Sequence, residues 1–183
     1  MKRIVAITGT PGVGKSTFAR KLALNLDARL IDVNSIVNEF GLFSGYDKDG
    51  AKLVELNALK KQLEKMIRSI GGSVVVEGHL LCEIKIKGAS VIVLREHLET
   101  IKKRLLKRRY PITKVRDNIV SEALDYCGVR SHANYTEVFE VMNDNNSLRK
   151  AMAMLNGRKA RLKPIDMIGE LEAVIKKDRR FAI

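Results

Sequence analysis

One segment near the start of the chain has the residue types and spacing of a phosphate-binding loop. Residues 9–16 read Gly-Thr-Pro-Gly-Val-Gly-Lys-Ser and match the pattern G-x-x-x-x-G-K-[ST] at every fixed position. Glycines let successive backbone N–H groups turn inward, where they can donate to phosphate oxygens. Lys15 is expected to reach the β- and γ-phosphates of a nucleotide, and Ser16 to place its hydroxyl on Mg²⁺. The segment therefore predicts a site for ATP and Mg²⁺.

The sequence on either side supports this interpretation. A β-branched apolar stretch precedes the loop at 2–8, and apolar residues at helical spacing follow it at 16–26. The N-terminus of such a helix adds its positive dipole end to a phosphate site. A chance glycine-rich turn, which is the alternative, would not explain both neighbours. The predicted nucleotide-binding residues are Gly12, Val13, Gly14, Lys15, Ser16 and Thr17, with Thr17 expected near the α-phosphate.

A second candidate group follows another apolar segment. Residues 73–77 read Ser-Val-Val-Val-Glu, and His79 comes two positions after Glu77. A carboxylate at the end of a buried strand can order the Mg²⁺ that accompanies a nucleotide. His79 could orient water or contact phosphate, and it would share a site with Glu77 if the chain stays extended. The alternative is an exposed acid beside a surface histidine. We favour catalytic roles for both residues and a metal-binding role for Glu77.

A third candidate group lies in the basic stretch 95–116, which carries nine lysines and arginines against two acids. Arg108 and Arg109 stand where Pro111 would interrupt a helix. An arginine on a loop above the phosphates can stabilise the charge of phosphoryl transfer, because its guanidinium stays protonated and binds phosphate bidentately. The residues alone leave Arg108 and Arg109 as rivals for this role.

These groups must be positioned by a framework of alternating strands and helices. Strands are expected at 2–8, 29–33, 73–77, 89–94 and 138–142, and helices at 16–26, 36–40, 53–70, 98–105, 115–126, 148–155 and 165–175. Asn34 and Ser35 are expected to cap the helix at 36–40, and 41–50 is expected to be a loop. The alternation predicts an α/β protein: a three-layer sandwich around a five-stranded parallel sheet. Its ligand site should lie at the carboxyl ends of the strands.

Length and composition favour one cytoplasmic domain. The chain has 183 residues, of which 45% are hydrophobic. No stretch approaches the ~20 apolar residues of a transmembrane helix, so no membrane partner is expected. The two cysteines, Cys82 and Cys127, are too few for a disulfide framework or a metal cluster and are expected to be small buried thiols.

The charge balance predicts anionic partners. There are 34 lysines and arginines against 21 acids, a net charge of +13, which attracts polyanions such as nucleotides or RNA. Five phenylalanines, four tyrosines and no tryptophan argue against a surface specialised for stacking single-stranded bases. Lys102 and Lys103 are expected on a solvated helix face.

Four segments together indicate a family. They are GTPGVGKST at 9–17, VVVEGHL at 74–80, VIVLR at 91–95 and RRYPITKVRDNIVSEAL at 108–124. This combination resembles the small adenylate-kinase-like NTPases of archaea and the eukaryotic nucleus, often called adenylate kinase isoenzyme 6. The resemblance covers about residues 3–156. Glu77 stands where that family more often has aspartate.

The resemblance implies a P-loop NTPase fold and an enzyme that transfers the terminal phosphate of ATP to a nucleoside monophosphate, usually AMP, and hydrolyses ATP slowly. It implies a monophosphate-binding segment at about 30–53 and a short lid at about 107–117, with Arg108 as the arginine that contacts nucleotide. Eukaryotic relatives take part in maturation of the small ribosomal subunit, so a ribosomal protein and rRNA are further expected partners. The whole chain, 1–183, would then be one kinase domain.

The residues and the resemblance leave two other functions open. The protein could be an ATPase assembly factor that acts on a ribosomal protein or rRNA without physiological monophosphate kinase activity, or a P-loop kinase of a small metabolite. A basic C-terminal extension at about 157–183 would support the first. The catalytic fold is expected to be complete by about Leu155. In the extension, Ile165, Ile168, Leu171 and Ile175 would pack on the domain, and the basic residues would meet RNA or simply stay solvated.

Overall fold

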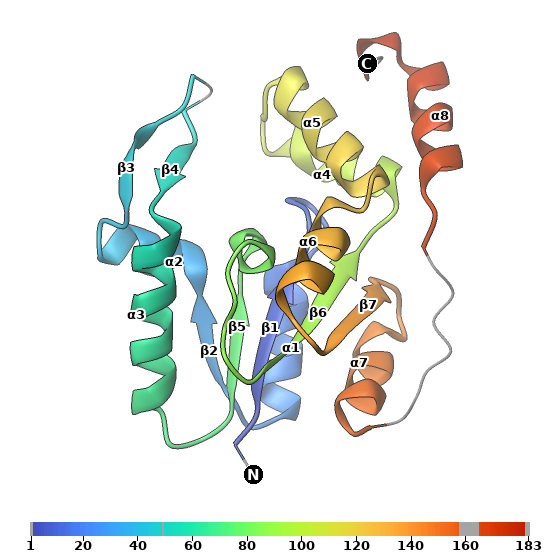
Figure 1. Cartoon of the computed structure of the whole chain (residues 1–183). Coiled ribbons are helices and arrows are strands. Elements are labelled where there is room, and N and C mark those ends of the chain that lie inside the picture. The colour runs from blue at the N-terminus through green and yellow to red at the C-terminus, as the bar shows by residue number, and fades with distance from the viewer. Residues whose placement is uncertain (1, 49, 158–164, 182–183) are drawn as a thin grey trace.

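A five-stranded parallel sheet forms the centre of the computed structural model, which describes residues 2–48, 50–157 and 165–181 (Figure 1). The strand order is β2–β5–β1–β6–β7. The strands are β1 (Ile4–Thr8), β2 (Arg29–Asp32), β5 (Val74–Glu77), β6 (Ala89–Arg95) and β7 (Val138–Met142). All five predicted strands are confirmed. Because every pairing is parallel, the carboxyl ends of all five strands lie at one edge of the sheet.

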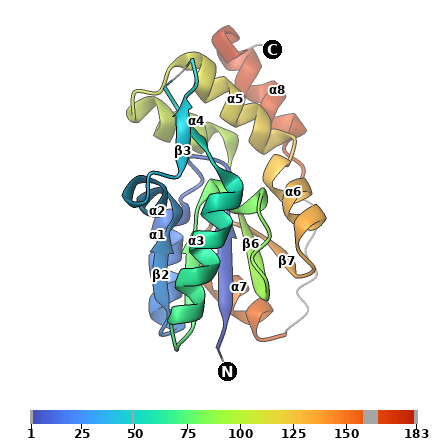
Figure 2. The same cartoon turned by 60° about the vertical axis from the view of Figure 1, so that its left-hand side comes forward.

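Helices cover both faces of this sheet. They are α1 (Lys15–Asn25), α2 (Val33–Glu39), α3 (Leu56–Ser69), α4 (Leu98–Lys107), α5 (Ile112–Ala123), α6 (Tyr126–Asn134), α7 (Ser147–Leu155) and α8 (Ile168–Lys177). In β1, Val5 and Ile7 belong to a core shared with α1, α4, α5, α7 and α8, whereas Ala6 belongs to a second core shared with α2 and α3 (Figures 1 and 2). This alternation follows from the two-residue period of a strand and confirms the three-layer α/β sandwich. No helix in the described ranges is both long and apolar enough to cross a membrane.

A hairpin stands where the sequence predicted a loop followed by the start of a helix. β3 (Phe43–Tyr46) pairs antiparallel with β4 (Lys52–Val54), and α3 begins only at Leu56. Lys52 Nζ lies 4.1 Å from the centre of the Phe43 ring and donates to Asn38 Oδ1 at the end of α2. Glycines and aspartates make up half of 41–50, so the four residues of β3 do not stand out as a strand in the sequence. The cap of α2 also differs from the prediction: Asp32 accepts a hydrogen bond from the backbone N–H of Asn34 at 2.8 Å.

The helix predicted at 115–126 is α5, which ends at Ala123, and the next helix, α6, was missed. The chain turns between α5 and α6 at Asp125, whose φ of 53° lies in the left-handed region. A short 3-10 helix, η1 (His79–Cys82), was also missed between β5 and β6. α6 and η1 lie beside each other above the sheet, and both contribute to the cavity described below (Figure 1).

The C-terminal segment completes the larger core, which confirms the expectation that its apolar residues pack on the domain. Met167, just before α8, and Leu171 and Val174, within α8, are buried in this core. Phe181 is buried there as well and ends a short 3-10 helix, η2 (Arg179–Phe181). Lys102 of α4 is buried as well and lies 4.5 Å from the Phe181 ring, so it is not on a solvated face. The buried face of α8 is shifted from the prediction, since Ile168 is 45% exposed.

Candidate active site

A cavity of about 640 Å³ opens above the carboxyl ends of β1 and β5. It is lined from five parts of the chain: the glycine-rich loop and the start of α1, the segment after β5, the hairpin region, the turn between α4 and α5, and the α5–α6 corner. Of the residues predicted to bind or react, those lining this cavity are Gly12, Gly14, Lys15, Ser16, Thr17, Glu77, His79 and Arg108. Val13 is fully buried beneath the loop.

The loop at 9–14 is packed so closely that its glycines cannot carry side chains. A Cβ on Gly9 would lie 2.3 Å from the carbonyl oxygen of Leu94 in β6. Gly12 and Gly14 both have φ of 99°, which L residues with side chains rarely adopt. A Cβ on Gly12 would also press against Ile101 and Leu105 of α4. The loop therefore rests directly on α4 and keeps its backbone exposed to the cavity.

Three polar side chains hold this loop from the side away from the cavity. Arg104 of α4 donates to the carbonyl oxygen of Gly12 at 2.9 Å, and Asn143, just after β7, donates to that of Val13 at 2.7 Å. Glu96 accepts from both, at 2.9 Å from Arg104 and 3.3 Å from Asn143. These bonds fix the carbonyl groups of Gly12 and Val13 and so hold the backbone of the loop in place.

Lys15 crosses the mouth of the loop. Its ammonium group donates to the carbonyl oxygens of Gly9 and Thr10, at 2.8 and 3.1 Å. Burial in the cavity wall lowers the pKa of Lys15, and the Glu77 carboxylate acts against that effect. Phosphate oxygens in the cavity would favour the charged form further. Lys15 therefore stands ready to exchange two neutral carbonyl partners for an anionic ligand.

Glu77 and His79 both face the cavity, as expected, although η1 rather than an extended chain begins at His79. Glu77 is only 5% exposed at the end of β5. Burial lowers the pKa of His79 to about 4, and the charges of Lys15 and Lys114 add to the effect. At neutral pH His79 is therefore an uncharged imidazole, which can donate one hydrogen bond and accept another.

The turn between α4 and α5 distinguishes the two rival arginines. Arg108 lines the cavity together with Tyr110 and Lys114. Arg109 is exposed and adopts a φ of 58°, so its backbone makes the tight turn that ends α4. The geometry brings Arg108, and not Arg109, to the predicted nucleotide site.

A second hollow of about 480 Å³ adjoins the first beneath the β3–β4 hairpin. The two linings share Asn34, Ala51, Leu56, His79 and Leu80. Polar groups of the second hollow come from α2 and the hairpin; they are Asn34, Asn38, Ser44 and Lys52. Two compartments that meet at His79 can hold two ligands side by side.

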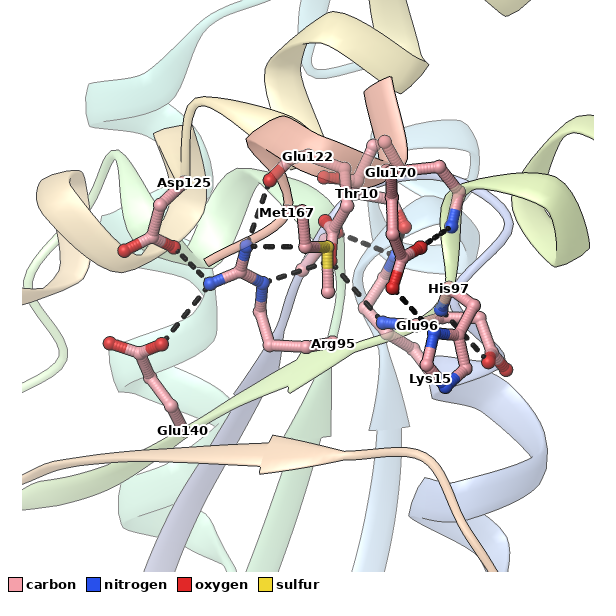
Figure 3. Close-up of polar contacts among 12 residues, drawn as sticks. Thr10, Lys15, Arg95, Glu96, His97, Glu122, Asp125, Glu140, Met167 and Glu170 are labelled. Atoms are coloured by element: carbon pink, nitrogen blue, oxygen red, sulfur yellow. Dashed lines mark hydrogen bonds and ion pairs between the residues drawn. The ribbon is translucent and has the colours of Figure 1, made fainter. Parts of the chain in front are cut away.

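A buried ion cluster anchors the α5–α6 corner of the first cavity (Figure 3). Arg95, 1% exposed at the end of β6, pairs with Glu122 at 2.8 Å, Asp125 at 2.5 Å and Glu140 at 3.1 Å. Burial alone would lower the pKa of Arg95, but the adjacent carboxylates outweigh burial and raise it. Arg95 therefore does not belong to a basic surface. It joins α5, α6 and β7 from inside, because a buried charge must keep its partners.

The residues at the loop fit ATP and Mg²⁺. Gly12 and Gly14 line the cavity with no side chain between their backbone and a bound phosphate, and oxygens such as the Ser16 hydroxyl and the Glu77 carboxylate are the ligands that a hard cation prefers. Phosphate oxygens and water would complete the coordination of Mg²⁺. When bound, the nucleotide supplies the phosphoryl group, and the residues named here would hold it.

Comparison with known proteins shows the family of this chain. A family model described as an AAA domain matches residues 5–125. A Pyrococcus furiosus protein named "Putative adenylate kinase" is 38% identical over 138 residues, which cover 75% of this chain and 73% of that protein. The chain belongs to the same family as this Pyrococcus furiosus protein. Another member of the family, from Methanocaldococcus jannaschii and of the same name, is 31% identical over 164 residues, 88% of this chain and 91% of that protein.

Solved structures show how widely the fold of this family is shared. Shikimate kinase from Acinetobacter baumannii, solved with shikimate, has a TM-score of 0.59 at 16% identity and covers 88% of this chain and 97% of its own. Shikimate kinase from Bacteroides thetaiotaomicron has a TM-score of 0.57 at 15% identity, over 85% and 96% of the two chains. These likenesses confirm the α/β fold of P-loop kinases.

Several residues of the cavity wall were not found from sequence. Asn118, Ser121, Tyr126 and Cys127 come from α5 and α6. Their only local signal is polarity on a helix that also carries core residues, which is typical of any surface helix. The turn at Asp125 brings Tyr126 and Cys127 to the cavity, and Asp125 pairs with Arg95, which is distant in sequence.

Proposed function

We propose that this protein is a nucleoside monophosphate kinase that transfers the terminal phosphate of ATP to AMP or a related monophosphate. One observation carries the proposal: the cavity at the glycine-rich loop and the hollow beneath the hairpin adjoin and share His79. A donor and an acceptor held in adjoining compartments can meet in line, which supplies much of the catalysis in phosphoryl transfer. The names of the archaeal relatives support the same activity.

Each residue has a role in this proposal. Lys15 and the loop N–H groups bind the phosphates, Ser16 and Glu77 hold Mg²⁺, and Thr17 contacts the α-phosphate. Arg108, on the short lid at about 107–117, stabilises negative charge as it develops on the transferred group. His79, uncharged at the junction, orients the acceptor phosphate or water. The segment at about 30–53, which contains α2 and the hairpin, binds the monophosphate.

The test is formation of ADP from ATP, measured with AMP, with CMP, UMP or GMP, and with no acceptor. We expect AMP to raise ADP formation at least tenfold over ATP alone, with two ADP produced for each ATP consumed. The variant Lys52→Ala should raise the KM for AMP and leave that for ATP unchanged, because Lys52 lines only the second hollow. Lys48→Ala, on the exposed hairpin, is the matched control. Equal ADP formation with and without any monophosphate would reject the kinase.

An ATPase that assists assembly of the small ribosomal subunit is the second candidate. The net charge of +13 favours it, since exposed basic residues such as Lys103, Lys107 and Arg109 remain free of the Arg95 ion cluster. The basic cluster expected at Arg158, Lys159, Arg161 and Lys163 lies outside the described residues. Binding to small-subunit rRNA and to small-subunit ribosomal proteins, measured from low to high salt, tests this role. We expect the logarithm of the binding constant to fall linearly with the logarithm of the salt concentration, with a slope that corresponds to several phosphate contacts. Salt-independent or absent binding would reject this role.

A further inference from the structure

The two cysteines of the chain meet in the nucleotide cavity, although they lie far apart in sequence. Cys82 ends η1 and Cys127 begins α6, and their sulfur atoms are 3.8 Å apart. Both are largely buried, at 2% and 7% exposure, yet both line the cavity that contains Lys15. A small molecule that enters the cavity can therefore reach them. The proposed phosphoryl transfer uses neither thiol.

The structure keeps the two sulfur atoms together through hydrogen bonds on either side of them. Glu83, next to Cys82, accepts from Tyr126 at 2.6 Å and pairs with Arg130 at 2.7 Å. Asn134, at the other end of α6, donates to the carbonyl oxygen of Cys82 at 2.7 Å. Three bonds thus join η1 to α6 around the thiol pair, and the Arg95 cluster fixes the start of α6. The thiols cannot separate without breaking these contacts.

The two thiols are also chemically unequal. The Cys82 thiol donates toward Cys127, which lowers the pKa of Cys127, and the charge of Lys15 lowers it further. The same hydrogen bond, together with burial, raises the pKa of Cys82. Cys127 is therefore the better nucleophile, and Cys82 keeps its proton until a partner forms beside it.

We propose that Cys82 and Cys127 are a redox-active dithiol, which a hydroperoxide that enters the nucleotide cavity converts to a disulfide. The Cys127 thiolate attacks the O–O bond, takes one oxygen as a sulfenic acid and releases the alcohol or water of the hydroperoxide. The Cys82 sulfur then attacks the Cys127 sulfur, the S–S bond forms and water leaves. In total, two thiols and one hydroperoxide give one disulfide, one water and one alcohol, or two waters when the oxidant is H₂O₂.

Closure of the disulfide would alter the cavity. The sulfur atoms must approach from 3.8 Å to about 2.05 Å, so η1 or α6 must shift or their side chains must rotate. Closure would also remove the one S–H proton of Cys82, for which the carbonyl oxygen of His79, 3.1 Å away, competes with Cys127 as acceptor. We therefore expect at least a fivefold loss of phosphotransfer on oxidation, restored by a dithiol reductant. This consequence rests on the proposed kinase function, whereas formation of the disulfide does not.

The test treats the full-length reduced protein with graded H₂O₂ and measures intact mass and free thiols. Because the chain has two cysteines, a monomer that loses two hydrogen atoms and both alkylatable thiols contains this disulfide. ATP with Mg²⁺ should slow the reaction several-fold by covering the cavity. Two thiols that still alkylate fully, a disulfide-linked dimer, or unlinked sulfinic acids would each overturn the proposal.

Two variants test the unequal roles of the thiols. In Cys82→Ser, Cys127 should accumulate as a sulfenic acid that dimedone traps, and in Cys127→Ser the Cys82 thiol should react at least tenfold more slowly. Equal rates in the two variants would overturn the assignment of Cys127 as nucleophile. Oxidised protein that retains full phosphotransfer would overturn the effect on activity. If the reduced protein itself forms no ADP, the kinase proposal fails, while the mass measurement still decides the dithiol.

Discussion

At the scale of single residues, the cavity holds groups whose ionisation is set by their surroundings. Lys15 has neutral carbonyl partners and a pKa lowered by burial, and His79 is uncharged for the same physical reason. Each has a measurable consequence. The Lys15 side chain should matter for chemistry and little for folding, while His79 should connect folding to pH.

Lys15→Ala should lower phosphotransfer and ATP hydrolysis at least about 100-fold, because it removes a charge that tracks the β- and γ-phosphates. The free energy of unfolding should change little, since the side chain is half-buried and its partners are carbonyl oxygens at the cavity mouth. Lys21→Ala, on the exposed side of the same helix, is the matched control for activity and stability. A Lys15→Ala enzyme with normal turnover would contradict the site assignment.

His79 should make the fold sensitive to acid. Its pKa falls from an ordinary 6.5 in the unfolded chain to about 4 in the folded protein, so the unfolded chain binds more protons between these values. Stability is therefore lost as the pH falls from about 6.5 through 4. Urea unfolding of wild type and His79→Gln at several pH values should show the variant losing less stability over this window, with His132→Gln as the control. Parallel profiles for all three proteins would refute the assignment.

At the scale of elements, α4 supports the site through its middle and through its C-terminal turn. Its middle residues Ile101, Arg104 and Leu105 contact the glycine-rich loop, and its C-terminal turn presents Arg108 to the cavity. Loop and turn are therefore parts of one packed unit. Contacts with this unit from β7 should tune nucleotide binding without touching the nucleotide.

Arg108→Ala should lower kcat at least tenfold while changing ATP binding much less, because an arginine above the transferred group acts mainly as charge develops. Arg109→Gly should keep normal kinetics and leave stability equal or slightly higher, since glycine adopts φ of 58° without a side-chain clash. Steady-state kinetics and ATP titration of both variants distinguish the two positions. Loss of kcat in Arg109→Gly with normal Arg108→Ala would reverse the assignment.

Asn143→Ala should weaken ATP binding roughly fivefold to 20-fold, because a hydrogen bond worth about 1–2 kcal/mol to the Val13 carbonyl is lost and the loop relaxes. Isothermal titration of ATP measures this loss. Asn145→Ala, two positions away on the exposed part of the same loop, is the control. Unchanged affinity in both variants would show that the loop keeps its shape without this support.

At the scale of the whole molecule, the larger core on one face of the sheet joins segments that lie far apart in sequence. The larger core takes residues from β1 at one end of the chain and from α8 and η2 at the other. Lys102 joins α4 to the C-terminal segment, because it pairs with Asp178 at 3.5 Å and contacts Phe181. The C-terminal segment is therefore a structural part of the domain.

Phe181→Ala should lower the free energy of unfolding by about 3–5 kcal/mol, since the ring is 1% exposed and its removal leaves a cavity. Ile168→Ala, at a position 45% exposed on α8, should change it by less than about 1 kcal/mol. Urea denaturation compares the two.

Removal of all residues after Gly157 should abolish cooperative unfolding, and a truncated protein that unfolds like the full chain would restore the expectation of a dispensable tail.

The parts of this structure that were predictable are those with local causes. Buried parallel strands read as β-branched runs, and the glycine-rich loop follows from the spacing of its glycines and Lys15. The β3–β4 hairpin was missed because its strands have only four and three residues and glycines and aspartates lie before and between them. Arg95 and Lys102 looked like parts of a basic surface, since a sequence does not show which distant carboxylate or ring will cover a charge. The cavity wall from α6 was missed for the same reason.

The central position of β1 determines the order in which the chain can fold as it is made. Its residue Ile4 lies between Val74 of β5 and Ala89 of β6, so both edges of this early strand wait for segments translated much later. Until β5 leaves the ribosome, β1 and the loop after it have no sheet to join. The first strand to be synthesised thus waits for β5 and then β6 to gain its two neighbours, and the nucleotide site can form only once more than half of the chain has emerged.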